Sequence, residues 1–216
     1  MRTGKVIKEQ YVMPQYLNFE TARFAGVGKY DIPQLDPVYE VDVDNWIGFN
    51  YCKTSKLPKS RTGVNFFIDD YQFERTWNQP MVYVKMLSGY GCVLSPDWSL
   101  FTDFPLAMQI FNHYRKHWMA RYWQDNGLTV VPTICWSDER SYDFCFDGEP
   151  LESVVAVSNV GCMQDKESAK LFEQGYNEML RRLRPKEVLF FAKTFGDYDG
   201  PITYIRYHIA KGMGVY

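Results

Sequence analysis

Three carboxylates stand directly after segments whose composition is typical of buried strands. Asp69 and Asp70 follow Val64–Ile68, and Asp97 comes shortly after Gly91–Leu94. The carboxyl ends of parallel strands meet at one edge of a sheet, so these side chains are expected to lie close together. Neighbouring carboxylates can divide acid and base roles between them, or bind a divalent cation. The alternative is that they cap turns by accepting backbone N–H groups.

Other strand ends show the same change from apolar to polar residues. Pro96 cannot donate a ladder hydrogen bond, so the strand before it ends there. Val130–Cys135, Val154–Val157 and Val188–Ala192 are likewise followed by aromatic or polar side chains. We therefore predict one shared ligand-binding site at this edge of the sheet. Its candidate residues are Asp69, Asp70, Ser95, Asp97, Trp98, Trp136, Ser158, Asn159 and Lys193.

The types of these residues suit a planar ligand with a polar edge. Trp98 and Trp136 are expected to stack on its ring, as aromatic side chains stack on bases. Ser158 and Asn159 are expected to hydrogen-bond to its edge, and Lys193 to pair with a phosphate. Each has a structural alternative: core packing for the indoles, turn formation for Ser158 and Asn159, and exposure to solvent for Lys193.

His113 and His117 lie four residues apart, a spacing at which two histidines of one helix can bind zinc. A zinc site needs further ligands, and no third ligand is recognisable for this pair. The five cysteines, at positions 52, 92, 135, 145 and 162, include no closely spaced pair. They are expected to be reduced thiols that fill the core as small apolar residues. No metal and no cofactor is therefore predicted.

Strands and helices are expected to alternate from residue 64 onward. Helices are predicted at 80–90, 103–125 and 166–183, with Asp103 and Asp165 as N-caps of the last two. The apolar segments between these helices predict a mainly parallel sheet covered on its faces, hence an α/β fold. Two architectures fit this pattern, namely a reduced or distorted (β/α) barrel and an open doubly wound sheet.

The long helix has a predicted buried stripe and a predicted solvent-facing side. Arg115, Lys116 and Arg121 are assigned to the solvent-facing side, because long basic side chains usually reach water. The stripe follows the helical spacing of the apolar residues. It consists of Leu106, Ile110, Phe111, Tyr114, Trp118 and Tyr122.

Residues 1–60 are punctuated by prolines and rich in aromatic residues. They are predicted to form an irregular, aromatic-rich N-terminal cap, and residues 61–216 the α/β domain. Within the cap, Val38–Val43 and Trp46–Tyr51 are predicted to be short strands. The chain has 216 residues, 46% of them apolar, which is enough for one sizeable core but not for two.

Several distinctive motifs gather around the strand ends and the long helix. They are Phe67-Ile68-Asp69-Asp70-Tyr71-Gln72-Phe73, Ser95-Pro96-Asp97-Trp98-Ser99, Gln109-Ile110-Phe111-Asn112, Arg115, Trp118, Tyr122-Trp123-Gln124, Pro132-Thr133-Ile134-Cys135-Trp136, Phe144-Cys145-Phe146-Asp147-Gly148 and Val155-Ala156-Val157-Ser158-Asn159-Val160-Gly161. In these motifs the segment 66–161 is similar to an uncharacterised domain family that is frequent in phages, prophages and other mobile elements. The resemblance implies a phage or mobile-element context, and it implies no activity.

Two segments also resemble, at the level of the fold, strands of the guanine-exchanging transglycosylases. Phe66–Phe73 is similar to their first barrel strand, where an aspartate ends an apolar strand before an aromatic residue. Val155–Gly161 is similar to a later, glycine-rich strand. The chain lacks their tandem-glycine strand end and their zinc-binding cysteine cluster, and a second catalytic aspartate is not identifiable. The likeness therefore bears on the fold and not on chemistry.

The overall charge limits the classes of partner. The chain carries 24 basic and 26 acidic residues, a net charge of −2, so the broad basic surface of a duplex-DNA-binding protein is not expected. No stretch approaches the roughly 18 apolar residues of a membrane span, and Met1–Gln10 lacks the apolar core of a signal peptide. We therefore expect no membrane partner and a cytoplasmic location, in the host cell if a phage encodes the protein. The sequence does not define an oligomeric state.

These observations favour one function and leave two others open. The first is a phage or mobile-element protein that binds a small nucleotide-like or base-containing ligand in a cleft at the carboxyl ends of its strands. The second is an enzyme that acts on a nucleobase or nucleotide, with Asp69 or Asp97 as acid–base group or nucleophile. The third, weaker alternative is a replication-associated protein that binds nucleic acid. Binding is preferred because no nucleophile–base pair is recognisable in the sequence.

Overall fold

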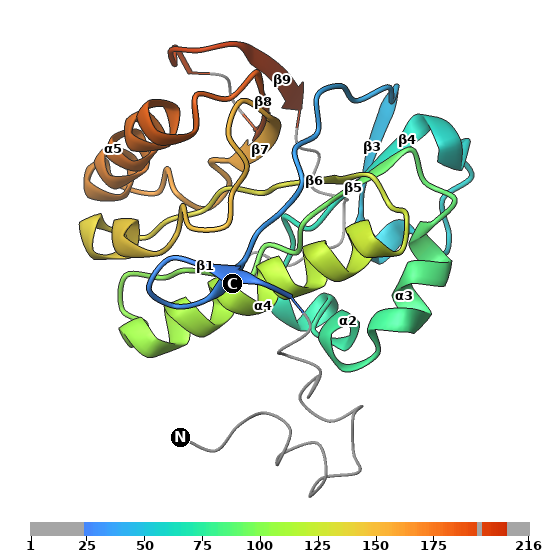
Figure 1. Cartoon of the computed structure of the whole chain (residues 1–216). Coiled ribbons are helices and arrows are strands. Elements are labelled where there is room, and N and C mark those ends of the chain that lie inside the picture. The colour runs from blue at the N-terminus through green and yellow to red at the C-terminus, as the bar shows by residue number, and fades with distance from the viewer. Residues whose placement is uncertain (1–23, 194–195, 207–216) are drawn as a thin grey trace, which may run out of the picture.

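Parallel strands form the centre of the computed structural model, which describes residues 24–193 and 196–206 (Figure 1). One sheet has the order β3-β4-β5-β6 and another the order β7-β8-β9, and all neighbouring strands in both are parallel. The strands are β3 (Asn45–Gly48), β4 (Thr62–Asn65), β5 (Cys92–Leu94), β6 (Val130–Val131), β7 (Val154–Ser158), β8 (Glu187–Ala192) and β9 (Ile202–Arg206). The predicted α/β fold with a mainly parallel sheet is confirmed.

A backbone bridge joins the two sheets just after β6. Thr133 and Ala156 form a parallel bridge, and the Ile134 amide donates to the Ala156 carbonyl oxygen at 2.8 Å. From β3 to β9 the strands therefore follow one another in chain order without reversal. A doubly wound sheet reverses its strand order at a switch point, whereas the strands of a (β/α) barrel run in chain order. The observed order favours the barrel type of winding.

Three aromatic side chains show that the sheet curls. The ring of Trp46 on β3 packs against Phe191 on β8 with centroids 5.2 Å apart, and Phe67 packs against Phe191 at 4.9 Å. Gly63 on β4 makes room for this packing, because a Cβ atom there would lie 2.5 Å from the Trp46 ring. Strands from the two sheets thus face each other across an aromatic interior. No hydrogen-bonded ladder joins β9 to β3 within residues 24–193 and 196–206.

Helix α5 (Lys166–Leu183) covers one face of β7 and β8. Successive strand residues point to opposite faces, and Val155 and Phe190 belong to the apolar cluster that includes Phe172 of the helix. The Asp165 carboxylate accepts hydrogen bonds from two backbone amides of the first turn, both at 2.9 Å. The predicted helix and its predicted N-cap are confirmed.

Helix α4 (Leu106–Asp125) confirms the long helix but begins differently from the prediction. Its N-cap is Pro105, with extended backbone and no side-chain hydrogen bond to the helix, so the prediction of Asp103 as the cap was wrong. Instead, the Gln109 side chain donates to the carbonyl oxygen of Phe104 at 3.0 Å. That bond fastens the chain before the helix to its first turns.

The buried face of α4 is polar over much of its length. Leu106 and Phe111 of the predicted stripe are exposed, whereas Trp118 and Tyr122 are buried as predicted. Lys116, predicted to face solvent, is 1% exposed, so that prediction was wrong. Polar groups can face inward here because the surrounding segments offer them hydrogen-bond partners. The buried polar residues of the helix are Gln109, Asn112, His113, Lys116 and His117.

Shorter elements surround the sheet. Helices α2 (Arg75–Asn78) and α3 (Pro80–Leu87) contact α4, and α3 confirms the helix predicted from residue 80. Strands β1 (Gly26–Val27) and β2 (Ile32–Pro33) form an antiparallel hairpin. The short 3₁₀ helices are η2 (Phe49–Tyr51), η3 (Lys59–Arg61), η4 (Asp70–Gln72) and η5 (Glu139–Asp143).

Two strand predictions for the N-terminal region need correction. Residues 38–43 form no strand, because only Val38 meets a backbone partner, the amide of Val154. The segment predicted as a strand at 46–51 is β3 followed by the helix η2. β3 itself pairs with β4 and is therefore part of the parallel sheet.

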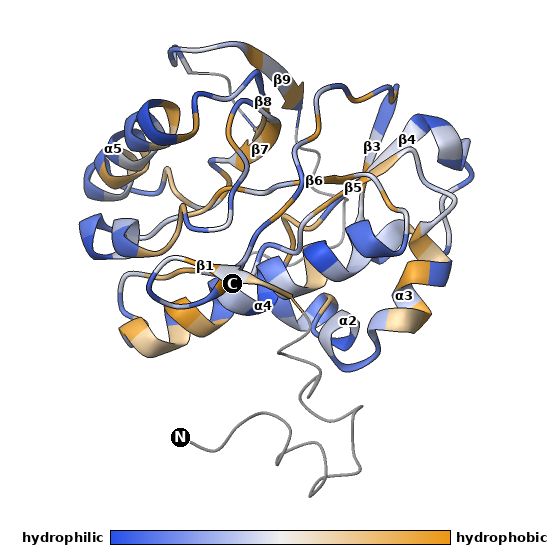
Figure 2. Ribbon diagram, viewed as in Figure 1, coloured by the Kyte–Doolittle hydropathy of each residue, from blue (hydrophilic) through white to orange (hydrophobic). Residues whose placement is uncertain are grey.

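The hydropathy of the residues shows where the core lies (Figure 2). Hydrophobic residues gather on the central strands, and the outer side of α5 is hydrophilic. Every residue of β4, β5 and β6 is buried. None of the helices in the described part of the chain is long and apolar enough to cross a membrane.

Candidate functional site

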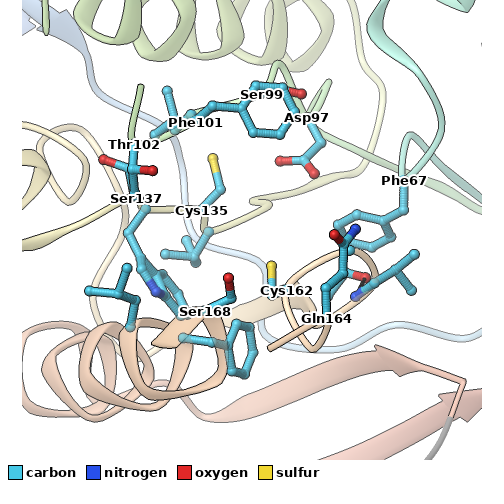
Figure 3. Close-up of a pocket in the computed structure, with 18 of the residues that line it drawn as sticks. Phe67, Asp97, Ser99, Phe101, Thr102, Cys135, Ser137, Cys162, Gln164 and Ser168 are labelled. Atoms are coloured by element: carbon cyan, nitrogen blue, oxygen red, sulfur yellow. Dashed lines mark hydrogen bonds between the residues drawn. The ribbon is translucent and has the colours of Figure 1, made fainter. Parts of the chain in front are cut away.

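A cavity of about 590 Å³ opens at the carboxyl ends of β4, β5, β6 and β7 (Figure 3). Its walls come from four strand-end segments, within residues 67–69, 97–102, 134–137 and 158–164, and from the first turns of α5. Small-molecule sites typically measure about 300–1,000 Å³. The parallel sheet thus brings segments that are distant in sequence to one cavity of ligand size.

Four of the candidate residues line this cavity, and each belongs to a different strand end. They are Asp69, Asp97, Trp136 and Ser158. Asp69 is exposed, whereas Asp97, Trp136 and Ser158 are half-buried. The Ser158 hydroxyl donates to the carbonyl oxygen of Phe191 at 3.1 Å, which ties the end of β7 to β8.

Asp70 and Ser95 support the cavity from outside it. Asp70 accepts hydrogen bonds from the amide and the hydroxyl of Ser99, at 3.1 and 3.0 Å. Ser99 lines the cavity, so Asp70 holds one of its walls. Ser95 is fully buried, and its hydroxyl oxygen accepts from the Thr133 amide at 2.8 Å. That bond extends the pairing of β5 and β6 beyond their ends.

Trp98, Asn159 and Lys193 do not line the cavity either. Trp98 is 1% exposed, and its indole N–H donates to Glu74 at 2.8 Å. Asn159 is buried, and its backbone amide donates to the carbonyl oxygen of Phe191 at 3.3 Å. Lys193 is exposed at the end of β8. Of the two tryptophans expected to stack on one ring, only Trp136 reaches the cavity.

Asp97 carries the most perturbed carboxyl group of the cavity. Its side chain points inward (Figure 3), and its Oδ1 atom is buried without a hydrogen-bond partner. Burial raises the pKa of Asp97 to about 7, and this effect outweighs the Lys116 ammonium, which lowers it. A carboxyl group with such a pKa can exchange a proton near neutral pH.

Trp136 forms a flat part of the cavity wall. It packs against Phe172 of α5 with ring centroids 5.3 Å apart. It also lies against Gly175, where a Cβ atom would come within 2.2 Å of the Trp136 ring atoms Cδ1 and Nε1. A glycine inside a helix is less favourable than alanine by about 0.5–1 kcal/mol. The absence of a side chain at Gly175 therefore allows the Trp136 indole to pack directly against α5.

Replacing Gly175 by alanine is expected to destabilise the protein by about 1–3 kcal/mol, because the added methyl group overpacks the helix against Trp136. Urea denaturation measures the change in the free energy of unfolding. In a second variant that also carries Trp136→Ala, the clash is gone and the loss from Gly175→Ala should disappear. Equal losses from Gly175→Ala in both backgrounds would contradict this role of Gly175.

Several lining side chains were not predicted from the sequence. The strand-exit pattern gives no signal for side chains farther along a loop, for Ser168 in α5, or for Cys135, which was assigned to the end of a strand. The unpredicted lining residues include Ser99, Phe101, Thr102, Cys135, Ser137, Cys162, Gln164 and Ser168. Burial raises the pKa of Cys162 to about 11 and that of Cys135 well above its ordinary value. Both are therefore thiols at neutral pH and weak nucleophiles. Among the described lining residues there is no lysine and no arginine.

A buried polar cluster lies behind Cys135. Lys116 Nζ donates to Glu149 Oε1 at 2.8 Å and lies 3.9 Å from the Cys135 sulfur. The same Glu149 oxygen is 2.9 Å from His117 Nε2, and the ring centroids of His113 and His117 lie 4.3 Å apart with the rings tilted by 51°. Burial alone would lower the pKa of Lys116, but the charge and the hydrogen bond of the Glu149 carboxylate raise it. The ammonium therefore stays charged inside the protein.

Glu149 is a third potential metal ligand beside His113 and His117, and the sequence did not reveal it. It stands 32 residues beyond His117. The ligand atoms of His113, His117 and Glu149 all lie within 4.8 Å of one another. No local spacing could have indicated this arrangement, because only the packing of residues 147–149 on α4 creates it.

The fold and the cavity define a parallel α/β protein with a ligand-sized pocket at the carboxyl ends of its strands. Residues 24–208 match the model of the family described as Domain of unknown function (DUF4417), and the chain belongs to this family. The resemblance found in the sequence motifs is therefore confirmed.

Two similar proteins come from mycobacteriophages. The Gene 1 protein of Mycobacterium phage L5 is 35% identical over 177 residues, which cover 79% of this chain and 74% of that protein. The Gene 1 protein of Mycobacterium phage D29 is 36% identical over 171 residues, 79% of this chain and 63% of that protein. No solved structure matches the chain. The chain thus has phage relatives, as the sequence motifs implied.

Proposed function

We propose that the cavity binds a small base-containing molecule, in the host cytoplasm if a phage encodes the protein. The observation that carries this proposal is the Asp97 carboxyl group, whose buried Oδ1 atom has no partner within the protein. Buried polar atoms are rarely left unpaired, and an unpaired one in a cavity suits a ligand that completes its hydrogen bonds. The N–H groups on the edge of a nucleobase are such donors.

The aromatic lining supports a planar ligand. Phe67, Phe101, Trp136 and Phe172 all contribute to the cavity wall. Base–aromatic stacking contributes about 1–3 kcal/mol per base. The hydroxyl and amide groups around the rings, including those of Gln164, can hydrogen-bond to a sugar or to a second edge of the base.

The charge of the lining favours a base or nucleoside over a highly phosphorylated nucleotide. Phosphate groups are usually bound by Arg, Lys or a helix N-terminus. The described lining has neither Arg nor Lys, and the exposed Lys193 lies outside it. The N-terminus of α5 already has an anionic partner in Asp165. A ligand without net negative charge fits these groups best.

A mixed-pool binding experiment tests the proposal. The full chain is incubated with nucleobases, nucleosides and nucleotides, separated from free ligand, denatured, and the released molecules are identified by mass spectrometry. The wild type should retain an intact base or nucleoside. Asp97→Asn should retain it about 10- to 100-fold less well, since a hydrogen bond to a charged group contributes about 1.5–3 kcal/mol.

Asp69→Asn is the matched control, because it removes an exposed carboxylate at the rim of the same cavity. It should retain the ligand nearly as well as the wild type. If the wild type retains nothing at high protein concentration, or if Asp97→Asn retains the ligand fully, the proposal fails.

The pKa of Asp97 favours one alternative, an enzyme that acts on a nucleobase or nucleotide. A carboxyl group with a pKa of about 7 is well placed for general acid–base catalysis at neutral pH. In the same experiment, release of a chemically altered molecule in place of an intact one would select catalysis over capture. Asp97→Asn should then abolish the conversion.

A further inference from the structure

The two histidines of the buried cluster have defined ring protons on their outer sides. His113 Nε2 lies 3.0 Å from the carbonyl oxygen of Asp147, and His117 Nδ1 lies 2.9 Å from that of Pro33. A backbone carbonyl only accepts hydrogen bonds, so both of these nitrogens must donate. The remaining nitrogens, His113 Nδ1 and His117 Nε2, then carry lone pairs if the rings are neutral.

Those lone pairs have no matching donors. His113 Nδ1 is buried and has no hydrogen-bond partner, and neither has Glu149 Oε2. His117 Nε2 lies 2.9 Å from Glu149 Oε1, and for a neutral ring both of these atoms are acceptors. A buried group of unpaired acceptors is costly unless a cation or a proton satisfies it.

We propose that His113 Nδ1, His117 Nε2 and the Glu149 carboxylate bind one divalent transition-metal ion. Two imidazoles and one carboxylate form a donor set that suits zinc, the metal we expect to bind best. Metal-binding histidines almost always donate their other ring N–H to a carbonyl or carboxylate, as both do here. Ligand atoms on one zinc ion lie roughly 3–3.5 Å apart, and one ligand atom from each of the three side chains lies within 4.8 Å of the others.

Lys116 does not occupy the site. It donates to Glu149 Oε1 and to the Thr133 carbonyl oxygen, at 2.8 and 2.7 Å, and leaves Oε2 free. Its positive charge is shared with a second carboxylate, because Asp97 lies within electrostatic range of Lys116. Glu149 can therefore face the ammonium with one oxygen and a metal ion with the other.

The surroundings indicate a structural role for the ion. His113, His117 and Glu149 are 1%, 0% and 5% exposed, so the site is closed to solvent and separate from the lining of the cavity. It would join α4 to the loop that carries Glu149, and through the bond from His117 to Pro33 it would also hold β2. Metal bound in such a site contributes directly to the stability of the fold.

Refolding of the full chain without a polyhistidine tag tests the site. The denatured wild type is refolded in buffer with Zn²⁺ or with EDTA, and after removal of free metal its zinc content is measured by plasma mass spectrometry. We expect about one zinc per chain after the first treatment, and a higher urea midpoint than after the second. Cobalt refolded in place of zinc should give visible absorption bands, a readout that needs no variant.

Two variants separate ligation from general damage to the core. Glu149→Gln should weaken zinc binding at least 100-fold, since even residues that only orient ligands contribute 10–100-fold. Asn112→Ala removes a different buried polar side chain of α4, which donates to the Ser99 carbonyl oxygen at 2.8 Å, and this variant should keep its zinc.

The proposal is wrong if the wild type refolds without metal and with equal urea midpoints in zinc and EDTA. It is also wrong if Glu149→Gln binds zinc as tightly as the wild type.

Discussion

Replacing Lys116 by methionine is expected to lower the free energy of unfolding by about 3–5 kcal/mol in metal-free buffer. The ammonium is 1% exposed and hydrogen-bonded to Glu149 at 2.8 Å. Its removal leaves the buried Glu149 carboxylate without its ammonium partner. An uncompensated charge in the core is among the most destabilising changes known for proteins. Urea denaturation at neutral pH measures the loss.

The double variant Lys116→Met, Glu149→Gln is the control for this effect. It removes both charges, so its stability should exceed that of Lys116→Met alone by a coupling energy well above 1 kcal/mol. Arg121→Met provides a matched change at a partly exposed basic residue of the same helix, paired with Asp36 and Asp125. It should lose no more than about 1 kcal/mol, as surface ion pairs do. If Lys116→Met were as mild as Arg121→Met, Lys116 would not be needed to balance the buried charge.

The same lysine shows where sequence reasoning about the fold fails. The strands from residue 62 onward and the three main helices follow from strand composition and apolar spacing, and the structure confirms them, whereas the strand predicted at 38–43 and the cap predicted at Asp103 were wrong. The face of α4 that enters the core does not follow, because hydrophobic periodicity assumes that buried residues are apolar. His113, Lys116 and His117 recur at helical spacing too, yet a polar stripe is ordinarily taken as the solvent side.

The cavity was partly predictable for a related reason. Strand ends are local features, and the rule that parallel strands share one carboxyl edge placed Asp69, Asp97, Trp136 and Ser158 together without any knowledge of packing. The turn that follows each strand decides whether the next side chain faces the cavity or the core. Trp98 stands one residue after Asp97 and is turned into the core, where it bonds to Glu74. That choice depends on tertiary contacts.

Replacing Asp97 by asparagine is expected to stabilise the protein at pH 8 by about 2–4 kcal/mol. The pKa of Asp97 rises from 3.8 to about 7 on folding, so ionisation is disfavoured in the folded state. Its stabilising contribution is therefore complete below pH 3.8 and is lost as the pH rises to about 7. Asparagine does not ionise and avoids that loss, which amounts to about 4 kcal/mol at most by the linkage relation.

Urea denaturation at pH 5 and at pH 8 measures this effect. The advantage of Asp97→Asn over the wild type should be less than half as large at pH 5 as at pH 8. Asp69→Asn, at an exposed carboxylate, should match the wild type at both. A gain in stability together with a loss of ligand retention would mark Asp97 as a group kept for binding at a cost to the fold, a trade-off common at functional sites. The expectation is contradicted if the advantage is equal at both pH values or if the variant is destabilised at pH 8. Either result would mean that other groups of the protein already compensate the Asp97 carboxylate. Its unpaired oxygen would then no longer argue for a ligand.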